Sequence, residues 1–419
     1  MNDKPGRLDP PSAIGYLPSA ISHSLLRILA MSMIARLMHD ASARVVYPFL
    51  PELSLGLRTP VSQVGAVLSL RSGIGMLSPV FGVLSDRVGH RRAMSAALAL
   101  LAVGLSVVGV SSALWMAAIG FVVTGVASAT YMPALLAYLS ERTPYERRGR
   151  ILGALELTWA LSGMIVVPAL GALIGPLGWR APFLALAIGS AVCAALTLSL
   201  PETPARLRAQ AEAFRITSIF RNRSAVAFLL VWLLMFLSFE NVQVGYASWF
   251  EAQFGLSAKD RGVAQTLFGV FEIIASASSS LFLDRMGKKR GVAGGLVVLV
   301  IGYGALLALG PSALWLGLAS MSAAFLGFEF SVVSSLSIAS EQVPQARGAM
   351  LALGVMMAGL GRMVGAMTGT ALLAAPGFGA SALLSALLCA AAVGLLALFV
   401  QEHPGVTQLH PRITPNPDH

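Results

Sequence analysis

Charged residues are scarce in this chain of 419 residues, since Asp, Glu, Lys and Arg make up only 11% of it. A soluble globular domain carries about 25%. The chain has two cysteines and six histidines, which argues against a disulfide framework and offers no cluster at metal-ligand spacing. It also lacks the phosphate-binding pattern Gly-x-x-x-x-Gly-Lys-Ser/Thr, so ATP-driven chemistry is not expected. We predict no metal site and no cofactor.

Apolar residues dominate instead, at 56% of the chain with a mean hydropathy of +0.77. Apolar stretches of about 20 residues recur from end to end, each long enough to cross a ~30 Å hydrocarbon core. Backbone groups in hydrocarbon must be satisfied within their own segment, so each stretch is predicted to be a helix. The chain is therefore predicted to be an all-α polytopic membrane protein, with twelve transmembrane helices at about 24–50, 61–83, 93–111, 113–139, 150–174, 181–200, 224–249, 262–283, 292–310, 313–340, 349–373 and 381–400.

The net charge of +10 follows this expected topology. If the N-terminus is cytoplasmic, the inner loops and tails hold twenty basic residues, whereas the outer loops hold Arg58, Arg180, Lys259 and Arg261. This positive-inside bias predicts that both termini are cytoplasmic and explains the basic charge without a nucleic-acid partner. Residues 1–22 are polar, so no cleavable signal peptide is expected.

One charged segment occurs once in each half of the chain. Gly-Val-Leu-Ser-Asp-Arg-Val-Gly-His-Arg-Arg at 82–92 returns as Ser-Leu-Phe-Leu-Asp-Arg-Met-Gly-Lys-Lys-Arg at 280–290. The two aspartates are 198 residues apart (284 − 86), and Glu141 and Glu341 match at an offset of 200 (341 − 141). A repeat of this kind predicts a substrate site near the bilayer midplane, between two halves. The predicted organisation is a six-helix half at 1–200, a cytoplasmic linker at 201–223, a second six-helix half at 224–400 and a cytoplasmic tail at 401–419.

The segment at 82–92 matches G-x-x-x-D-R-x-G-x-R-R, the signature that major facilitator superfamily transporters carry in the loop between helices two and three. Over essentially its whole length the chain resembles a member of that superfamily. The resemblance implies two pseudo-symmetric six-helix bundles, and it implies that Asp86 and Arg87 stabilise the state closed to the cytoplasm. The alternative is that these charges only set topology. The expected gate residues are Gly82, Asp86, Arg87, Gly89, Arg91 and Arg92, with Asp284 and Arg285 in the second copy.

Helix five carries a second resemblance. Gly163, Pro168 and Gly171 fit the antiporter motif G-x-x-x-G-P-x-x-G-G of the twelve-helix drug:proton antiporters, whereas Val167 and Ala172 replace two of its glycines. A proline and small residues allow a helix to bend and pack closely. The alternative is an ordinary kinked membrane helix. Helix four also departs from that group, because it lacks the arginine that those antiporters carry.

Ten ionisable residues lie inside the predicted spans. A charge in the bilayer is costly unless it faces a cavity or a partner, so helices three, six, nine and twelve, which carry none, are expected to face lipid. The others are expected to surround a proton-coupling cavity. These residues are Asp40, Glu156, Glu240, Glu272, Glu329, Arg27, Arg36, Arg44, Arg71 and Arg362.

The local sequence separates these candidates. Arg36, Asp40 and Arg44 share one helical face at i, i+4 and i+8, which suits either an ion-pair switch or a permanent structural pair. Glu240 has no cation within a helical turn, so it is the preferred proton-binding candidate, followed by Glu272 and Glu329. Glu156 lies close enough to the basic inner loop to pair there.

Two further sets of side chains complete the predicted site. Arg362 is either a counter-ion or an anion ligand. Four aromatic or polar side chains are candidates to line the substrate pocket, and they are Tyr131, Trp159, Tyr246 and Asn241.

The sequence therefore predicts a secondary active transporter that moves a small organic solute by alternating access, and not an enzyme. Proton-coupled efflux is the preferred mode, driven by the proton gradient. The alternatives are a proton symporter or facilitator for metabolite uptake, and a non-transporting membrane sensor or assembly factor. The protein is expected to be a monomer in the lipid bilayer of a bacterial inner membrane.

Overall fold

The computed structural model describes residues 23–143, 145–202, 216–343 and 346–402, and within those ranges the chain is helical without strands. The first half contains α1 (His23–Arg44), α2 (Leu50–Gly56), α3 (Val61–Ile74), η1 (Gly75–Leu77), α4 (Ser78–Val88), α5 (His90–Val110), α6 (Leu114–Arg142), α7 (Tyr145–Leu161), η2 (Ser162–Val166), α8 (Val167–Leu177) and α9 (Ala181–Leu198). The second half contains α11 (Arg223–Gln243), α12 (Tyr246–Phe254), α13 (Ala258–Met286), α14 (Lys288–Ala308), η3 (Gly310–Ser312), α15 (Leu314–Gln342), α16 (Arg347–Ala374) and α17 (Phe378–Phe399). A short helix, α10 (Ile216–Arg221), lies within the predicted linker.

These elements form twelve transmembrane helices in two six-helix bundles, as the sequence predicts. Eleven of the twelve are long and apolar enough to span a membrane by length and composition alone. The remaining one is α1, which contains four charged residues, Arg27, Arg36, Asp40 and Arg44. Arg36, Asp40 and Arg44 are buried against protein, so the helix does not need the hydropathy of a lipid-facing span.

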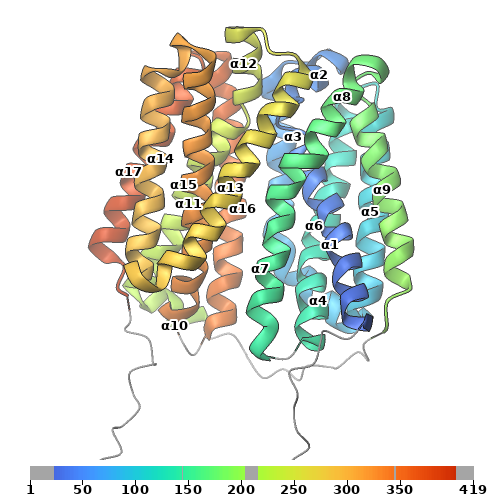
Figure 1. The fold of residues 1–419 in the computed structure, drawn as a ribbon, viewed down its shortest axis with the longest axis vertical. Coiled ribbons are helices and arrows are strands. Elements are labelled where there is room, and N and C mark those ends of the chain that lie inside the picture. Colours follow the sequence, from blue (N-terminus) through green and yellow to red (C-terminus); the bar gives the residue numbers. More distant parts are fainter. Residues whose placement is uncertain (1–22, 144, 203–215, 344–345, 403–419) are drawn as a thin grey trace, which may run out of the picture.

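Each bundle has its own hydrophobic core. One cluster of buried side chains comes almost entirely from α1–α9, and the other from α10–α17. In Figure 1 the first bundle lies on the right and the second on the left. Four helices whose spans carry no charge, α5 and α9 on one side and α14 and α17 on the other, lie at the lateral edges. The charged helices therefore lie between them, where the two bundles meet.

The bundles contact each other through one end of the molecule, called here the upper end, where α2, α8 and α12 lie in Figure 1. There α13 packs against α8 and η2, and α16 packs against α3. Glycines permit the close approach: a Cβ at Gly65 would lie 2.1 Å from Thr370 Oγ1, and one at Gly269 would lie 2.9 Å from the Ala160 carbonyl oxygen. The opposite end, called the lower end, contains α4 and α10.

The signature segment at 82–92 is not a loop, which corrects the sequence prediction. Helix α4 continues to Val88 and α5 begins at His90, so Gly89 alone makes the turn, with φ = 96°. Gly287 makes the same turn between α13 and α14, with φ = 86°. A side chain disfavours this backbone region, so glycine lets two helices reverse within a single residue.

The structure also breaks helices that the sequence predicts as continuous. The first span stops at Arg44 and resumes as α2, and the seventh stops at Gln243 and resumes as α12. The fifth span contains the π-helical turn η2 just before Pro168, which lacks an amide hydrogen for the helix ladder. The breaks in spans one and seven lie at matching positions of the repeat.

Candidate functional site

A cavity of about 240 Å³ lies between the two bundles, below their contact layer. The first bundle contributes Arg36 from α1 and Glu156 and Trp159 from α7. The second bundle contributes the remaining lining residues, which are Phe236, Ser276, Phe328, Glu329, Val332, Val333, Leu336 and Arg362. The lining thus combines aromatic and aliphatic surface with both signs of charge, as expected for a site that orients a small organic molecule.

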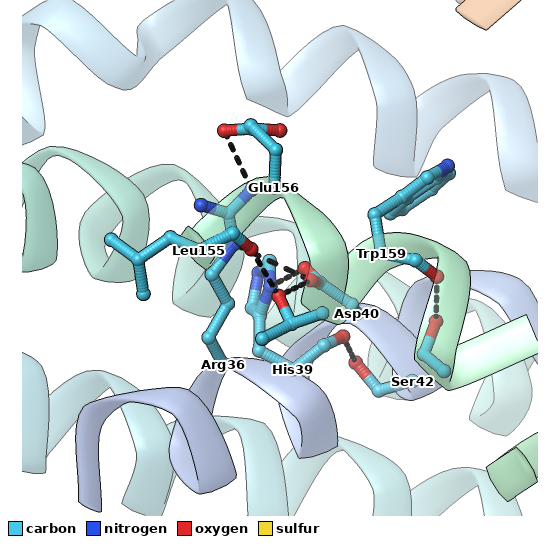
Figure 2. Close-up of polar contacts among 9 residues, drawn as sticks. Arg36, His39, Asp40, Ser42, Leu155, Glu156 and Trp159 are labelled. Carbon is cyan, nitrogen blue, oxygen red and sulfur yellow. Dashed lines mark hydrogen bonds and ion pairs between the residues drawn. The ribbon is translucent and has the colours of Figure 1, made fainter. Parts of the chain in front are cut away.

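The first-bundle wall is an internally paired polar network (Figure 2). Arg36 donates to Glu156 Oε1 at 3.0 Å, and its Nε lies 3.4 Å from Asp40 Oδ2. Asp40 also accepts from Thr158 at 2.7 Å and contacts His39 Nδ1 at 3.1 Å. Arg36 and Asp40 are almost fully buried, whereas the Glu156 side chain is 46% exposed. Glu156 thus pairs with Arg36 of α1, and the side chains of Arg147, Arg148 and Arg150 in the basic inner loop lie outside the described residues.

Above the cavity, Arg44 connects the two bundles. Its Nη2 donates to both carboxylate oxygens of Glu272, at 2.5 and 2.6 Å, and both side chains are 2% exposed. The guanidinium also lies over the Trp159 ring, 4.2 Å from its centroid. Hydrogen bonds between two ionised groups are the stronger kind, and the burial of this pair excludes competing water. Arg44 pairs with Glu272 of the opposite bundle, and not with Asp40 of its own helix.

A second polar cluster lies between α1, α3, α11 and α16. Tyr47, just after the end of α1, donates to Glu240 Oε1 at 2.7 Å. Arg71 and Arg362 act electrostatically on Glu240 and on each other. Neither guanidinium makes a hydrogen bond or ion pair with a described residue, although Arg362 lies 5.1 Å from the Phe236 ring centroid. Glu240 therefore has cations nearby that its own helix does not supply.

Glu329 differs from the other acids of the site. Its side chain is 7% exposed and accepts a hydrogen bond from Ser276 Oγ at 2.9 Å. It has no ion pair with a described residue. The nearby charges are two carboxylates, Glu272 and Glu156, and one cation, Arg44, which is already bound to Glu272. A carboxylate with a single neutral partner and acidic neighbours is suited to binding a proton.

The upper end is closed by Arg261, a residue that the sequence places in an outer loop. It lies instead in the first turn of α13 and is 1% exposed. Its guanidinium binds Glu52 of α2, donates to the Pro48 carbonyl at 2.9 Å and approaches Glu251 at 3.3 Å. The sequence offers a signal for this cluster, since Glu52 and Glu251 differ by 199 residues, close to the repeat offset (251 − 52).

The described contacts of the first signature copy stay within the first bundle. Asp86 lies 3.8 Å from His90 Nε2, and Arg91 and Arg92 bind Glu202 at 3.1 and 2.8 Å. The second copy is similar: Lys288 binds Glu341, its amide donates to Glu402, and Lys289 donates to the Ala397 carbonyl. Arg87 and Arg285 lie at the lower end, Gly82 packs near Pro133, and the side chain of Asp284 lies outside the described residues.

The three helix-five positions lie at contacts in the upper half of the molecule. A Cβ at Gly163 would lie 2.6 Å from Arg44 Nη1, and one at Gly171 would lie 3.0 Å from the Phe49 ring and 3.1 Å from the Ala258 carbonyl. Pro168 packs against Gly262 of α13, whose added Cβ would lie 3.3 Å from it. The motif therefore permits close approach between the bundles and makes room for the Arg44 guanidinium.

Of the four predicted pocket-lining side chains, Trp159 lines the cavity. Tyr131 is buried within the first bundle, with its ring 5.1 Å from that of His39. Tyr246 accepts from Gln265, and Asn241 donates to the Ser381 carbonyl and to Ser385 at 3.0 Å, so both are occupied inside the second bundle. Arg27 also lies apart, as an exposed partner of Ser199. Sequence reasoning missed Tyr47, Ser276, Phe236 and Phe328.

Two helical bundles related by an internal repeat, with a charged cavity between them, are an architecture found in many transporters. The family model described as Major Facilitator Superfamily matches residues 32–278 and 233–415. The chain belongs to that superfamily, whose members are transporters and not enzymes.

Individual relatives agree with this assignment. The chain is 27% identical over 275 residues to the class C tetracycline resistance protein of Escherichia coli, a match that covers 62% of this chain and 68% of that protein. Its fold matches an inward-facing bacterial homologue of the lysosomal transporter Spinster, with a TM-score of 0.77, 10% identity and coverage of 90% and 97%. It also matches a D-xylose-proton symporter, with a TM-score of 0.73, 18% identity and coverage of 90% and 98%.

Proposed function

We propose that this protein is a proton-coupled efflux transporter, which exchanges protons for a small organic solute by alternating access. The observation that carries the proposal is Glu329, a nearly buried acid on the cavity wall whose hydrogen-bond partner is a neutral hydroxyl. A group that binds a proton inside the substrate cavity couples the two fluxes directly, because proton and substrate then compete for one site. The similarity to a tetracycline resistance protein supports the efflux direction.

The partners of the other acids support Glu329 as the proton carrier. Asp40, Glu156 and Glu272 each contact an arginine. Glu240, which the sequence favours, accepts from Tyr47 and has two arginines nearby. A bound or nearby cation stabilises the ionised carboxylate, so these four acids are better suited to electrostatic roles beside arginine than to carrying a proton.

The arrangement of charge supports a cytoplasmic location for the lower end. Basic residues of the helix ends gather there, whereas the upper end holds few, and positive charge is retained on the cytoplasmic side of bacterial inner membranes. With this orientation the contact layer seals the cavity from the outside. The described state is then inward-facing, with Arg44–Glu272 and the Arg261 cluster as the outer closure.

The signature segment has its proposed gate role in the opposite state. In the inward-facing state its described contacts are internal to each bundle. When the lower ends approach each other, Asp86 and Arg87 are available at the surface to contact the second bundle, since the Asp86 side chain is 41% exposed. The helix-five glycines act on the other side, where they permit outer closure.

Proton release from energised inside-out vesicles tests the proposal. Four probes are added in turn: tetraphenylphosphonium, benzoate, phenylalanine and xylose. At least one is expected to release protons from vesicles containing the wild-type protein. Glu329→Gln should abolish the release, whereas Glu251→Gln, which leaves Arg261 bound to Glu52, should preserve it.

Two results would contradict parts of this account. Release that survives Glu329→Gln but is lost in Glu240→Gln would make Glu240 the proton carrier. Uptake of a probe into right-side-out cells, without proton release from inside-out vesicles, would identify a symporter or a facilitator instead.

A further inference from the structure

The charges that line the cavity are not all compensated by one another. On the first-bundle wall Arg36 and Glu156 form a pair at 3.0 Å, and Asp40 lies behind them. Arg36 is shared by these two carboxylates, so this wall leaves a substrate no free positive charge. The second-bundle wall carries Arg362 and Glu329, which do not pair with each other or with another described residue.

Arg362 leaves a surplus of positive charge on its side of the cavity. The carboxylate that acts on it is Glu240, which is shared with Arg71 and hydrogen-bonded to Tyr47. One carboxylate therefore faces two guanidiniums. Arg362 lines the cavity with its guanidinium near the Phe236 ring, and a guanidinium is well suited to bind a carboxylate through two parallel hydrogen bonds.

Glu329 leaves a surplus of negative charge once its proton is released. The nearby cation, Arg44, is already bound through Nη2 to both carboxylate oxygens of Glu272. Ser276 Oγ, the donor to Glu329, also lines the cavity. An ionised Glu329 thus lacks a cation, and the cavity is the side from which one can be supplied.

Apolar side chains line the cavity beside these two charged groups. Phe236 and Phe328 are in edge-to-face contact, with ring centroids 5.2 Å apart, and both line the cavity. Three aliphatic residues of α15 extend this surface on the same wall, and Trp159 of α7 continues it on the opposite wall. The volume of about 240 Å³ accepts a compound built on one aromatic ring.

We propose that the substrate is a small aromatic zwitterion, whose carboxylate binds Arg362 and whose ammonium binds Glu329. The inference rests on the proposed function, because it uses the same cavity and the same proton site. A simple anion would leave Glu329 without a cation, and a simple cation would leave Arg362 without an anion. Exchange follows from this arrangement: the ammonium binds to the ionised Glu329 carboxylate after its proton has left.

Four compounds with the same ring and chain length isolate each charge. Phenylalanine carries both charges, phenylalaninamide only the ammonium, 3-phenylpropionate only the carboxylate, and 3-phenylpropanamide neither. Binding to the purified full-length protein in lipid nanodiscs is measured by calorimetry at neutral pH. Phenylalanine should bind at least about tenfold more tightly than each of the others, as expected for one charged hydrogen-bonded contact.

Three variants assign the contacts. Arg362→Gln should remove the preference for phenylalanine over phenylalaninamide, and Arg362→Lys should retain part of it. Glu329→Gln should remove the preference for phenylalanine over 3-phenylpropionate. Arg27→Gln, which changes an exposed arginine bound to Ser199, should leave all four affinities unchanged.

Equal binding of phenylalanine and either singly charged compound would overturn the inference, as would no binding of any compound, because each is small enough for the cavity. The proposed function fails separately. Tight binding of phenylalanine without proton release would refute antiport and leave the substrate class intact. Proton release by tetraphenylphosphonium alone would support antiport and refute the zwitterion.

Discussion

Arg44 is the residue on which closure of the upper end depends most directly. It is buried, it reaches across to Glu272 of the other bundle, and it lies over Trp159. The absence of a side chain at Gly163 leaves the space that its guanidinium occupies. One glycine of the helix-five motif therefore supports an ion pair that joins residues 228 positions apart.

Gly163→Ala is expected to weaken this ion pair. The added Cβ would lie 2.6 Å from Arg44 Nη1, so the guanidinium must shift from its position beside Glu272 and Trp159. We expect a loss of about 1.5–3 kcal/mol in the free energy of unfolding, the contribution of a hydrogen bond to a charged group. The measurement is thermal unfolding of the purified protein in detergent.

The matched control is Gly175→Ala in α8, where an added Cβ meets nothing within 4 Å. Alanine is favoured over glycine inside a helix, so this variant should be as stable as the wild type or slightly more stable. Equal unfolding temperatures for the two variants would show that the Gly163 contact does not matter.

The sequence identifies the ionisable residues of the site but not their partners. Depth along a helix can be counted from the ends of a span, so Asp40, Glu240 and Arg71 could be predicted to lie near the bundle interface. Pairing depends on which helices face each other, and local spacing gives the wrong partner for Arg44. Tyr47 could have been found, because it lies 199 residues before Tyr246, a residue already selected (246 − 47).

At the scale of elements, single glycines determine how helices follow one another. Gly89 and Gly287 each reverse the chain in one residue with positive φ. After the first turn the Arg92 side chain binds Glu202, and after the second the Lys288 backbone amide donates to Glu402. The signature segment is thus a structural joint as well as a charged surface.

Gly89→Ala should destabilise the protein for a purely conformational reason. An added Cβ at this position meets nothing within 4 Å, so the change alters no packing. A residue with a side chain in this backbone region costs about 1–3 kcal/mol. Thermal unfolding should show that loss, whereas Gly394→Ala in α17, where an added Cβ also meets nothing, should be neutral or stabilising.

A loss of stability as large in Gly394→Ala as in Gly89→Ala would contradict this explanation.

The positions of the helices are well predicted from apolar runs, to within a few residues at most ends. The breaks after Arg44 and Gln243 could not be predicted that way, because hydropathy continues across them. They depend on contacts from elsewhere in the chain. The Arg261 side chain of α13, for example, donates a hydrogen bond to the Pro48 carbonyl between α1 and α2.

At the scale of the whole molecule, the two bundles are held together on one side of the cavity. Arg44–Glu272, Tyr47–Glu240 and the Arg261 cluster all cross between them, and glycines bring α3 close to α16 and α13 close to η2. The repeat offset of 198–200 residues predicts two like halves. It cannot predict which end is closed, because pseudo-symmetric halves fit both the inward-facing and the outward-facing state.

Cysteine labelling tests which side the cavity faces. Leu336 lines the cavity and is 44% exposed, whereas the native Cys193 and Cys389 are buried and should not react. Leu336→Cys should react with a membrane-impermeant maleimide in inside-out vesicles and not in intact cells. Leu55→Cys, 74% exposed on α2 at the upper end, should show the opposite pattern, and labelling of Leu336→Cys from outside would reverse the proposed orientation.

The most direct test of the central claim is the infrared spectrum of the purified protein as the pH is changed. The carbonyl stretch of a protonated carboxyl group lies apart from that of a carboxylate, so a proton on a buried acid can be observed without knowledge of the substrate. The account predicts a carboxyl band that disappears in Glu329→Gln and persists in Glu240→Gln. A band that survives Glu329→Gln and is lost in Glu240→Gln would contradict it.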